Sequence, residues 1–566
     1  MTAMPQRIQD EPKLKMRPEL ELVLRSAHAN SAENEDRIRV LLGDGVNWTE
    51  VLACAIQHNL LPVLYERFHA LDSGGPPQDQ REIWTELARN QGRSSLALLS
   101  ETLRLHGLFE AKQIPAIPYK GAVLAWLAYG DFSHRVFTDI DFVVPQRHIP
   151  QAMAVLQAAG YDAQFDPQEA QAGERKPAVG EYAFVRRLHL LRVELHTERT
   201  LRYFPSPLNL DEMNVRLMPV EIAGRTVHTF SVEDTLVMLC VHGAKHFWER
   251  LAWIVDVAKL ATAQPVDWPL AMRIAAEMKC SRLLLLGLYL AHDIFGAALP
   301  QTILEKARRD ARVRWLAGEV CEQIEGISDP STGVLRRALF RIRSRDKVNE
   351  GLWHLLRLAI SPTESDRQMV RLPRVLAPAY MFVRPWRLLR EYGLGFRRRV
   401  KPDLAIYVPT PPEVVDKMLR FAEVSPGDVL YDLGCGDGRI VVMAAEKYGI
   451  RGVGVDINPR HIAEAKDNAR QHGVENRVQF LLGDAKKLDV SAATVVTLYL
   501  GADGNLRLAD RLRTQLRPGS RVVSRNFQIY GWPPEQTESH VWPNGIETPL
   551  YLWRIKELSA KNPTAE

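Results

Sequence analysis

The chain has 566 residues, of which 46% are hydrophobic and 25% are charged, and its formal net charge is +5 at pH 7. This composition is ordinary for a soluble globular protein, and the length predicts roughly two to four domains. A net charge this small on a chain of this length does not indicate a nucleic-acid partner.

The cysteines are odd in number, scattered and without metal-ligand spacing, which indicates a reducing compartment and predicts a cytoplasmic protein. They are Cys54, Cys240, Cys280, Cys321 and Cys435. The polar start of the chain does not resemble a signal peptide. The most apolar run, 283–299, is interrupted by His292 and Asp293, so it predicts a buried helix rather than a membrane span.

The N-terminal part is predicted to begin with helices and then to change character. Helical patterning fills roughly 15–112 and is interrupted by a Gly- and Pro-rich loop at 72–79. A short predicted strand then ends at Lys120-Gly121.

Two carboxylates lie on the next predicted strand. Because residues two apart on a strand project to one face, Asp139 and Asp141 form a pair whose Cα atoms are about 6–7 Å apart. Such a pair suits Mg²⁺ carrying a nucleoside triphosphate. A further predicted strand, 191–196, brings Glu194 as a possible third acid beside them.

This constellation resembles the polymerase-β-like nucleotidyltransferases, in particular an uncharacterised family with Lys-Gly, Arg-x-x-x-Asp-Ile-Asp and an acidic-Leu-His strand. The matching positions are Lys120, Gly121, Arg135, Asp139, Asp141, Glu194 and His196. The resemblance extends through 241–256 and covers most of 35–395. It implies Asp139, Asp141 and Glu194 as catalytic metal ligands, with Mg²⁺ and a nucleoside triphosphate as cofactors. The implied nucleotide-binding residues are Lys120, Gly121 and Arg135.

The chain departs from the broader superfamily, which has Gly-Ser or Gly-Gly where this sequence has Lys120-Gly121. Lys120 would then pair a phosphate as a point charge, and Arg135 would be a second clamp. The implied chemistry is attack of an acceptor hydroxyl or phosphate on the α-phosphate, with Glu194 completing the site or acting as base. The alternative is a structural Asp-x-Asp pair in a non-catalytic binding module.

A histidine pair follows on a predicted helix. His242 and His246 have the i, i+4 spacing of zinc ligands, but the intervening Gly-Ala-Lys lacks the glutamate base of a metalloprotease. We therefore expect these rings to pack or hydrogen-bond near the nucleotide site, with Trp248 and Trp253 in the core.

Residues 260–400 are predicted to be helical and to cover the nucleotidyltransferase core. The basic and aromatic run 384–402 reads either as a phosphate contact or as a solvated hinge between domains, and a single run favours the hinge. We expect the domain boundary at 393–403.

The run 431–440 predicts a strand, a glycine turn and a helix, which is the opening of a Rossmann-like βαβ unit. Gly434, Gly436 and Gly438 allow positive φ and close approach of the backbone to a ligand. Asp437 would repel a pyrophosphate at the helix N-terminus, so the acid favours a cationic ligand such as S-adenosylmethionine.

Three more predicted strands lie at 451–456, 478–482 and 493–500. Asp456 ends the first of them, about 20 residues beyond the glycine loop, where such folds hold ribose hydroxyls. Asp484 follows the second and is placed to accept a hydrogen bond from the adenine amino group.

Residues 403–556 resemble class I, seven-strand S-adenosylmethionine-dependent methyltransferases, and among these a group that includes mitochondrial protein-lysine methyltransferases. The shared segments are 407–411, 431–439 and 454–459. The resemblance implies that 407–411 covers the methionine end of the cofactor. The implied cofactor-binding residues are Tyr407, Thr410, Asp432, Gly434, Gly436, Gly438, Asp456 and Asp484. A Rossmann-like domain without a cofactor is the alternative.

The methyl acceptor is predicted less narrowly. No Asn-Pro-Pro-Tyr follows the fourth strand, which argues against methylation of an adenine or amide nitrogen. We expect Tyr499 to line the acceptor pocket and Asp503 to attract a lysine ammonium or take its proton. A strand-end aromatic and a turn acid are the alternatives. The partner is therefore a protein lysine or a small molecule.

The predicted fold class is a multidomain α/β chain, with a helix-rich α+β nucleotidyltransferase-like domain before a Rossmann-like seven-strand methyltransferase domain. The predicted segments are an extension at 1–34, the first domain at 35–300, a helical extension and basic linker at 301–400, the methyltransferase at 401–556 and a tail at 557–566. Two hypotheses remain, a bifunctional enzyme and a methyltransferase with a non-catalytic substrate-binding module. Convergence of the carboxylates of Asp139, Asp141 and Glu194 would favour the first.

Overall fold

In a computed structural model, the chain divides into two compact units, Met1–Arg399 and Val400–Glu566, which are described separately below. The described residues are 16–28, 32–69, 75–164, 180–186, 191–198, 208–325, 333–347, 349–352, 356, 370, 380–388, 410–529, 531–541 and 547–556. The predicted boundary at 393–403 and most of the basic run 384–402 lie outside them.

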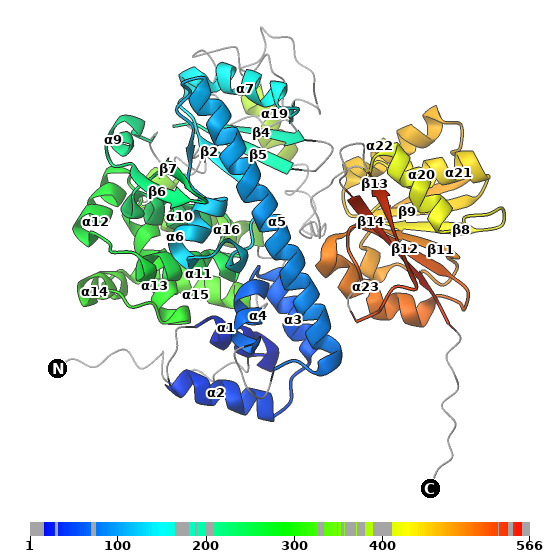
Figure 1. Ribbon diagram of the computed structural model, residues 1–566, viewed down its shortest axis with the longest axis horizontal. Helices are drawn as coiled ribbons and strands as arrows, with labels where there is room; N and C mark the ends of the chain where they lie inside the picture. Colours follow the sequence, from blue (N-terminus) through cyan, green and yellow to red (C-terminus); the bar gives the residue numbers. More distant parts are fainter. Residues whose placement is uncertain are drawn as a thin grey trace. The chain divides into compact units, whose positions relative to one another are not determined.

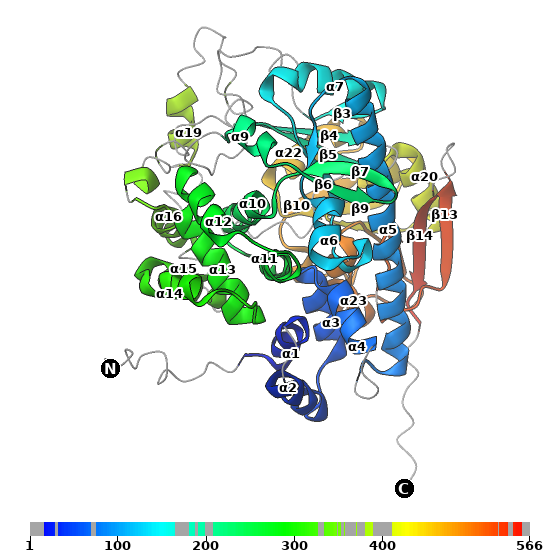
Figure 2. The same ribbon diagram turned by 60° about the vertical axis from the view of Figure 1, so that its left-hand side comes forward.

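The N-terminal unit begins with a group of helices. They are α1 (Pro18–Ala27), α2 (Ala32–Gly43), α3 (Trp48–Gln57), α4 (Leu61–His69) and α5 (Gln78–Ala111). Helix α3 begins at its N-cap Asn47, whose side chain accepts hydrogen bonds from the next turn. Helix α5 has 34 residues and runs along the length of this unit, where it contacts the first two strands of a sheet (Figure 1, Figure 2).

That sheet has five strands in the order β1-β2-β5-β4-β3. The strands are β1 (Ile117–Pro118), β2 (Asp139–Val143), β3 (Asp162–Ala163), β4 (Glu181–Arg186) and β5 (Leu191–His196). Strands β2 and β5 are parallel neighbours in which Asp141 lies opposite Glu194. Helix α6 (Gly121–Tyr129) and helix α7 (Ile149–Ala158) flank β2 in the chain.

The rest of the unit is a hairpin and a helical layer. The hairpin is β6 (Met218–Ile222) with β7 (Arg225–Thr229), after α9 (Leu210–Val215). The helices are α10 (Val232–Lys245), α11 (Leu251–Ala263), α12 (Trp268–Glu277), α13 (Ser281–Phe295), α14 (Gln301–Arg309), α15 (Ala311–Ile324), α16 (Gly333–Arg343) and α19 (Tyr380–Leu388). The apolar run predicted as a buried helix is α13, which packs against α10 and α11. Among the described residues, no helix is long and apolar enough to cross a membrane.

The C-terminal unit contains a seven-stranded sheet with the order β10-β9-β8-β11-β12-β14-β13, which confirms the predicted Rossmann-like seven-strand fold. The strands are β8 (Val429–Leu433), β9 (Arg451–Asp456), β10 (Val478–Leu482), β11 (Val495–Leu498), β12 (Arg521–Arg525), β13 (Gln536–Val541) and β14 (Glu547–Arg554). The first five in spatial order are parallel, whereas β14 is antiparallel to both of its neighbours. The carboxyl ends of the parallel strands therefore share one edge, where ligands bind in such sheets.

Two hydrophobic cores cover the two faces of this sheet. Adjacent residues on β11 point to opposite faces, because Val495 belongs to one core and Val496 to the other. Residues of α20 (Pro412–Phe421), α21 (Arg439–Tyr448) and α22 (Pro459–Gln471) form the first core, and residues of α23 (Gly501–Gln515) contribute to the second. Every residue of both cores comes from the C-terminal unit.

Candidate active sites

The glycine loop of the C-terminal unit lies between β8 and α21. Gly434, Gly436 and Gly438 have φ of +89°, +53° and +75°, a region that side chains disfavour. Gly434 is also closely packed, because a Cβ atom there would lie 2.3 Å from Cδ2 of Leu500. The sequence-predicted turn therefore depends on glycine for its backbone conformation.

Asp456 at the end of β9 anchors this loop. Its Oδ2 accepts a hydrogen bond from the Gly436 amide at 2.9 Å, and its Oδ1 accepts one from the Asn458 amide at 2.8 Å. Nδ1 of His461 lies 3.2 Å from the same Oδ1. A carboxylate oxygen can accept more than one hydrogen bond, so Asp456 retains acceptor capacity for ribose hydroxyls at the sheet edge.

Asp432 is an interior residue rather than a surface acid. Asp432 is 3% exposed, and its carboxylate accepts a hydrogen bond of 2.8 Å from Thr497 Oγ1 on β11. Burial raises the pKa of Asp432 to about 7, and the neighbouring Asp456 and Asp437 act in the same direction. This residue ties β8 to β11 directly beneath the glycine loop.

Asp437 has a different role from the one that the loop sequence suggests. Its carboxylate pairs with the Arg439 guanidinium, with Nε 2.9 Å from Oδ1, and Nη1 of Arg439 donates to the Thr410 carbonyl at 3.0 Å. Because Asp437 is neutralised locally, attraction of a cationic ligand falls to the other acids at this edge. Arg439, which the sequence analysis did not single out, holds the segment before α20 against the loop.

The remaining predicted cofactor residues are placed as follows. The Asp484 Oδ1 accepts a hydrogen bond from the Lys486 amide at 3.1 Å, directly after β10. Thr410 is buried, and Tyr407 lies outside the described residues. The donor set fits S-adenosylmethionine, because one acid ends β9, another follows β10, and three positive-φ glycines follow β8.

The residues predicted to contact the methyl acceptor lie at the ends of β11 and β12. The Tyr499 ring stacks on Phe527 with 6.0 Å between the ring centroids, and burial raises the pKa of Tyr499. Cζ of Arg525 lies 4.4 Å from the Tyr499 ring centroid. The side chain of Asp503 lies outside the described residues.

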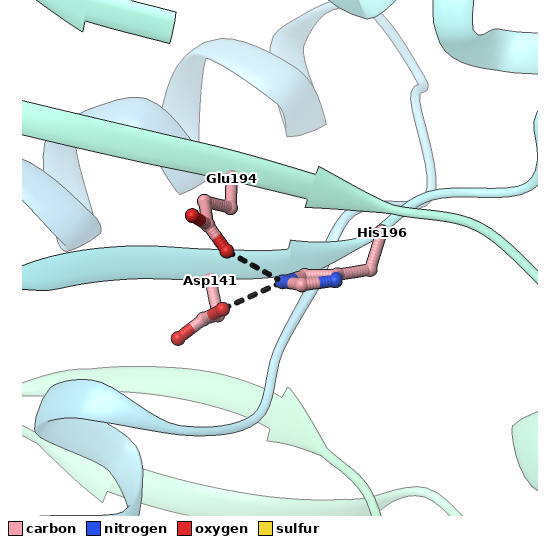
Figure 3. A group of neighbouring side chains, drawn as sticks. All are labelled: Asp141, Glu194 and His196. Atoms are coloured by element: carbon pink, nitrogen blue, oxygen red, sulfur yellow. Dashed lines mark hydrogen bonds and ion pairs between the residues drawn. The ribbon is translucent and has the colours of Figure 1, made fainter. Parts of the chain in front are cut away.

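In the N-terminal unit, Asp141, Glu194 and His196 form one cluster (Figure 3). One ligand atom from each lies within 4.8 Å of the others. His196 Nε2 is 2.6 Å from Asp141 Oδ1 and 3.5 Å from Glu194 Oε2, and Lys120 Nζ is 3.5 Å from the same Asp141 oxygen. Two carboxylates and an imidazole are a donor set that suits a divalent cation.

This cluster differs from the predicted ligand set, which contained Asp139 in place of His196. The parallel register places Asp141 opposite Glu194, whereas Asp139 lies opposite Arg192. His196 is two residues beyond Glu194 on the same strand, so both side chains project to one face. The strand period alone could have indicated His196 as the third member.

The charges of this cluster are strongly coupled. Burial opposes ionisation of Asp141, but the Lys120 ammonium and the His196 hydrogen bond outweigh it and lower the pKa of Asp141. Burial also opposes the charge of Lys120, and Asp141 raises the pKa of Lys120 in spite of it. Burial and repulsion from Asp141 and Glu194 raise the pKa of Asp139 to about 6.

Arg135 makes a buried ion pair instead of lying open for a phosphate. Its Nε and Nη2 each donate to the Asp256 carboxylate at 2.9 Å, and Nη1 is 3.4 Å from the Gly121 carbonyl. The Tyr129 hydroxyl donates to the same carboxylate at 2.8 Å. Arg135 therefore holds the Lys120-Gly121 turn in place, and Asp256 on α11 is the partner that the sequence analysis missed.

His242 and His246 pack beside Trp253 in tilted and edge-on contacts, with 4.8 Å between the two imidazole centroids. Burial lowers the pKa of both histidines, that of His246 to about 4, so both rings are neutral at pH 7. Within the described residues, the metal-ligand cluster identified does not include either of them.

Comparison with known proteins finds a matching family model for each unit. A family described as uncharacterised nucleotidyltransferases matches residues 44–296, and the ANTKMT methyltransferase domain matches residues 432–536. The protein-lysine N-methyltransferase of Saccharolobus islandicus is 43% identical over 152 residues, which are 27% of this chain and 94% of that protein.

Two other similar proteins also match the C-terminal unit. The adenine nucleotide translocase lysine N-methyltransferase of Mus musculus is 33% identical over 151 residues, which are 26% of this chain and only 64% of that relative. A solved structure titled as an RNA methyltransferase from Salinibacter ruber with S-adenosyl-L-homocysteine is 46% identical, with a TM-score of 0.25, over 28% of this chain and 100% of that one.

The fold and the sheet-edge residues define an S-adenosylmethionine-dependent methyltransferase, preceded by a nucleotidyltransferase-like domain. Through its C-terminal unit, the chain belongs to the family of the protein-lysine N-methyltransferases.

Proposed function

We propose that the C-terminal unit transfers a methyl group from S-adenosylmethionine to the ε-amino group of a lysine in a protein. The observation that carries this proposal is the 43% identity to a protein-lysine N-methyltransferase over nearly the whole length of that relative. The cofactor would be held by the three glycines of the loop, with Asp456 on the ribose and Asp484 on the adenine. Tyr407 and Thr410 would lie over its methionine end.

When bound, the cofactor supplies an electrophilic methyl group on a sulfonium. The protein then has to orient the amine and remove its proton, because an ammonium has no lone pair with which to attack. The partly buried Tyr499, whose pKa is raised, stays a neutral phenol, so it can position an amine but is not the base. We assign the proton acceptor to Asp503, at the start of α23.

The test is incubation of the full chain with S-adenosylmethionine carrying a tritiated methyl group and an extract of cells. The expected result is label in protein, recovered as methyllysine after acid hydrolysis. Heat-treated chain is the control for non-enzymatic labelling. Label only in the small-molecule fraction would instead identify a small-molecule acceptor and refute the lysine assignment.

A second proposed activity is metal-dependent nucleotidyl transfer by the N-terminal unit. It is supported by the convergence of Asp141, Glu194 and His196, because Glu194 faces the same side of the sheet as Asp141. A divalent ion held there, with Asp139 beside it, would carry the nucleotide phosphates, and Lys120 would contact one of them. The acceptor oxygen would attack the α-phosphate and pyrophosphate would leave.

This second activity is tested with nucleoside triphosphates labelled at the α-phosphate, Mg²⁺ or Mn²⁺, and an extract as the source of acceptors. We expect label to enter an acceptor with the wild-type chain and not with Asp141→Asn. Absence of transfer by the wild type with each of the common nucleotides would favour a non-catalytic substrate-binding module instead.

A further inference from the structure

Arg525, the last residue of β12, is a buried cation that has no hydrogen-bonding counter-ion in the described part of the chain. The residue is only 2% exposed, and its Nε and Nη1 make no hydrogen bond with the residues described. Its one identified partner among them is the face of the Tyr499 ring. Burial lowers the pKa of Arg525, which shows that its surroundings disfavour the charge.

Arg521 on the same strand is an arginine whose hydrogen-bond donors do have partners, and it serves as a comparison for Arg525. Its Nη2 pairs with the Asp428 carboxylate, and its Nη1 donates to the Glu423 carbonyl at 2.9 Å. Among the described residues, Arg525 has neither kind of partner. Because an unpaired buried charge is costly, a buried arginine at this position calls for an anion that is not among the residues described.

The location of Arg525 indicates where this anion would bind. β12 pairs with β11 on the side opposite to β14, and β11 pairs in turn with β8, which leads into the glycine loop. Arg525 lies over Tyr499, so its side chain reaches from β12 toward β11 at the carboxyl edge. The turn that follows has Asn526 at φ +63°, and Phe527 stacks on Tyr499. The cation is therefore part of the methyl-transfer edge, about 10 Å or two strand spacings from the glycine loop.

We propose that Arg525 binds a carboxylate of a molecule seated at this edge, most directly a carboxylate of the methyl acceptor. This inference rests on the proposed methyl transfer. It restricts the methyl acceptor to molecules that carry a carboxylate near the amine that is methylated. A guanidinium binds a carboxylate through two parallel hydrogen bonds, and Nε and Nη1 offer unused donors. The methionyl carboxylate of the cofactor is the other source of the same chemistry.

The experiment uses acetate as a carboxylate probe on the full-length chain. Melting of the C-terminal unit is followed in equal concentrations of sodium acetate and sodium chloride at about pH 7.5, with and without saturating S-adenosylhomocysteine. Wild type is compared with Arg525→Met and with Arg470→Met, a matched loss of an exposed arginine from α22. With about 100 mM acetate and a dissociation constant near 10 mM, the wild-type melting temperature should exceed that in chloride by about 3–6 °C.

Arg470→Met should keep this shift, whereas Arg525→Met should lose it and melt higher than wild type in chloride. Persistence of the wild-type shift with S-adenosylhomocysteine supports an acceptor carboxylate, and its disappearance supports the cofactor carboxylate. Equal acetate shifts in wild type and Arg525→Met would overturn the proposal. If Arg525→Met does not fold, Arg525→Lys takes its place and should show a smaller shift. If the wild type does not bind S-adenosylhomocysteine, the proposed methyl transfer is refuted. The proposal for Arg525 is still tested in that case, because the comparison between acetate and chloride is also made without S-adenosylhomocysteine.

Discussion

Replacement of Asp432 by Asn should remove a pH dependence from the stability of the C-terminal unit. The pKa of Asp432 is about 7 in the folded chain, against an ordinary value of 3.8. Because the folded pKa is the higher one, the protonated form contributes stability that is complete below pH 3.8 and is lost as the pH rises toward 7. The full loss is about 4 kcal/mol at about 1.36 kcal/mol per pKa unit, and about 3 kcal/mol of it falls between about pH 5 and pH 8.

Asn cannot ionise, and its amide oxygen can still accept the hydrogen bond that Thr497 donates to Asp432. The difference in unfolding free energy between Asp432→Asn and wild type should therefore shift in favour of the variant by about 3 kcal/mol from about pH 5 to pH 8. Hydrogen exchange of amides in β8 and β11, corrected for intrinsic rates, measures the unfolding free energy of the C-terminal unit separately from that of the N-terminal unit. Asp510→Asn, an exposed acid on α23, is the control. A difference that stays constant with pH would refute the burial argument.

Three other substitutions, two of them paired with a control substitution, test the described sites. Asp456→Ala should abolish binding of S-adenosylmethionine in calorimetric titration, and Asp139→Ala should leave it intact; equal losses would mean that the two units do not act independently. Gly434→Ala should destabilise the C-terminal unit by about 2 kcal/mol or more in urea unfolding, since it combines φ strain with overlap on a leucine. Gly519→Ala has similar φ but open space, so it should cost only about 1 kcal/mol, and equal costs would exclude the packing argument. Asp256→Ala leaves the buried Arg135 guanidinium without its carboxylate partner and should lower the free energy of unfolding by about 3–5 kcal/mol. An unchanged stability in thermal unfolding would contradict a buried ion pair.

Features encoded within a short stretch were predictable from the sequence. The glycine turn, the strands on either side of it and the acid at Asp456 follow from local spacing and apolar patterning. Asp139, Asp141 and Glu194 were placed on strands for the same reason. The parallel pairing of β2 with β5 then decided which of them meet, and it brought in His196.

Contacts between distant segments were not predictable. Arg135 and Asp256 are 121 residues apart, and no local pattern identifies one as the partner of the other. The interpretation of Arg135 as a phosphate clamp treated an isolated cation as available for a ligand. Asp437 likewise has a partner, Arg439 two residues later, which the loop sequence alone did not identify. Burial and pairing are tertiary properties, and a charge acquires its role only once they are known.

The self-contained cores of the C-terminal unit have a consequence for how such a chain arises. Among the described residues, both layers of apolar packing around the seven-stranded sheet come from within that unit. A relative made up almost entirely of the matching region is itself a protein-lysine N-methyltransferase. A gene encoding this unit can therefore be joined behind an unrelated one without any need for new interior packing. Tethering of this kind changes which molecules a methyltransferase meets while leaving its own architecture untouched.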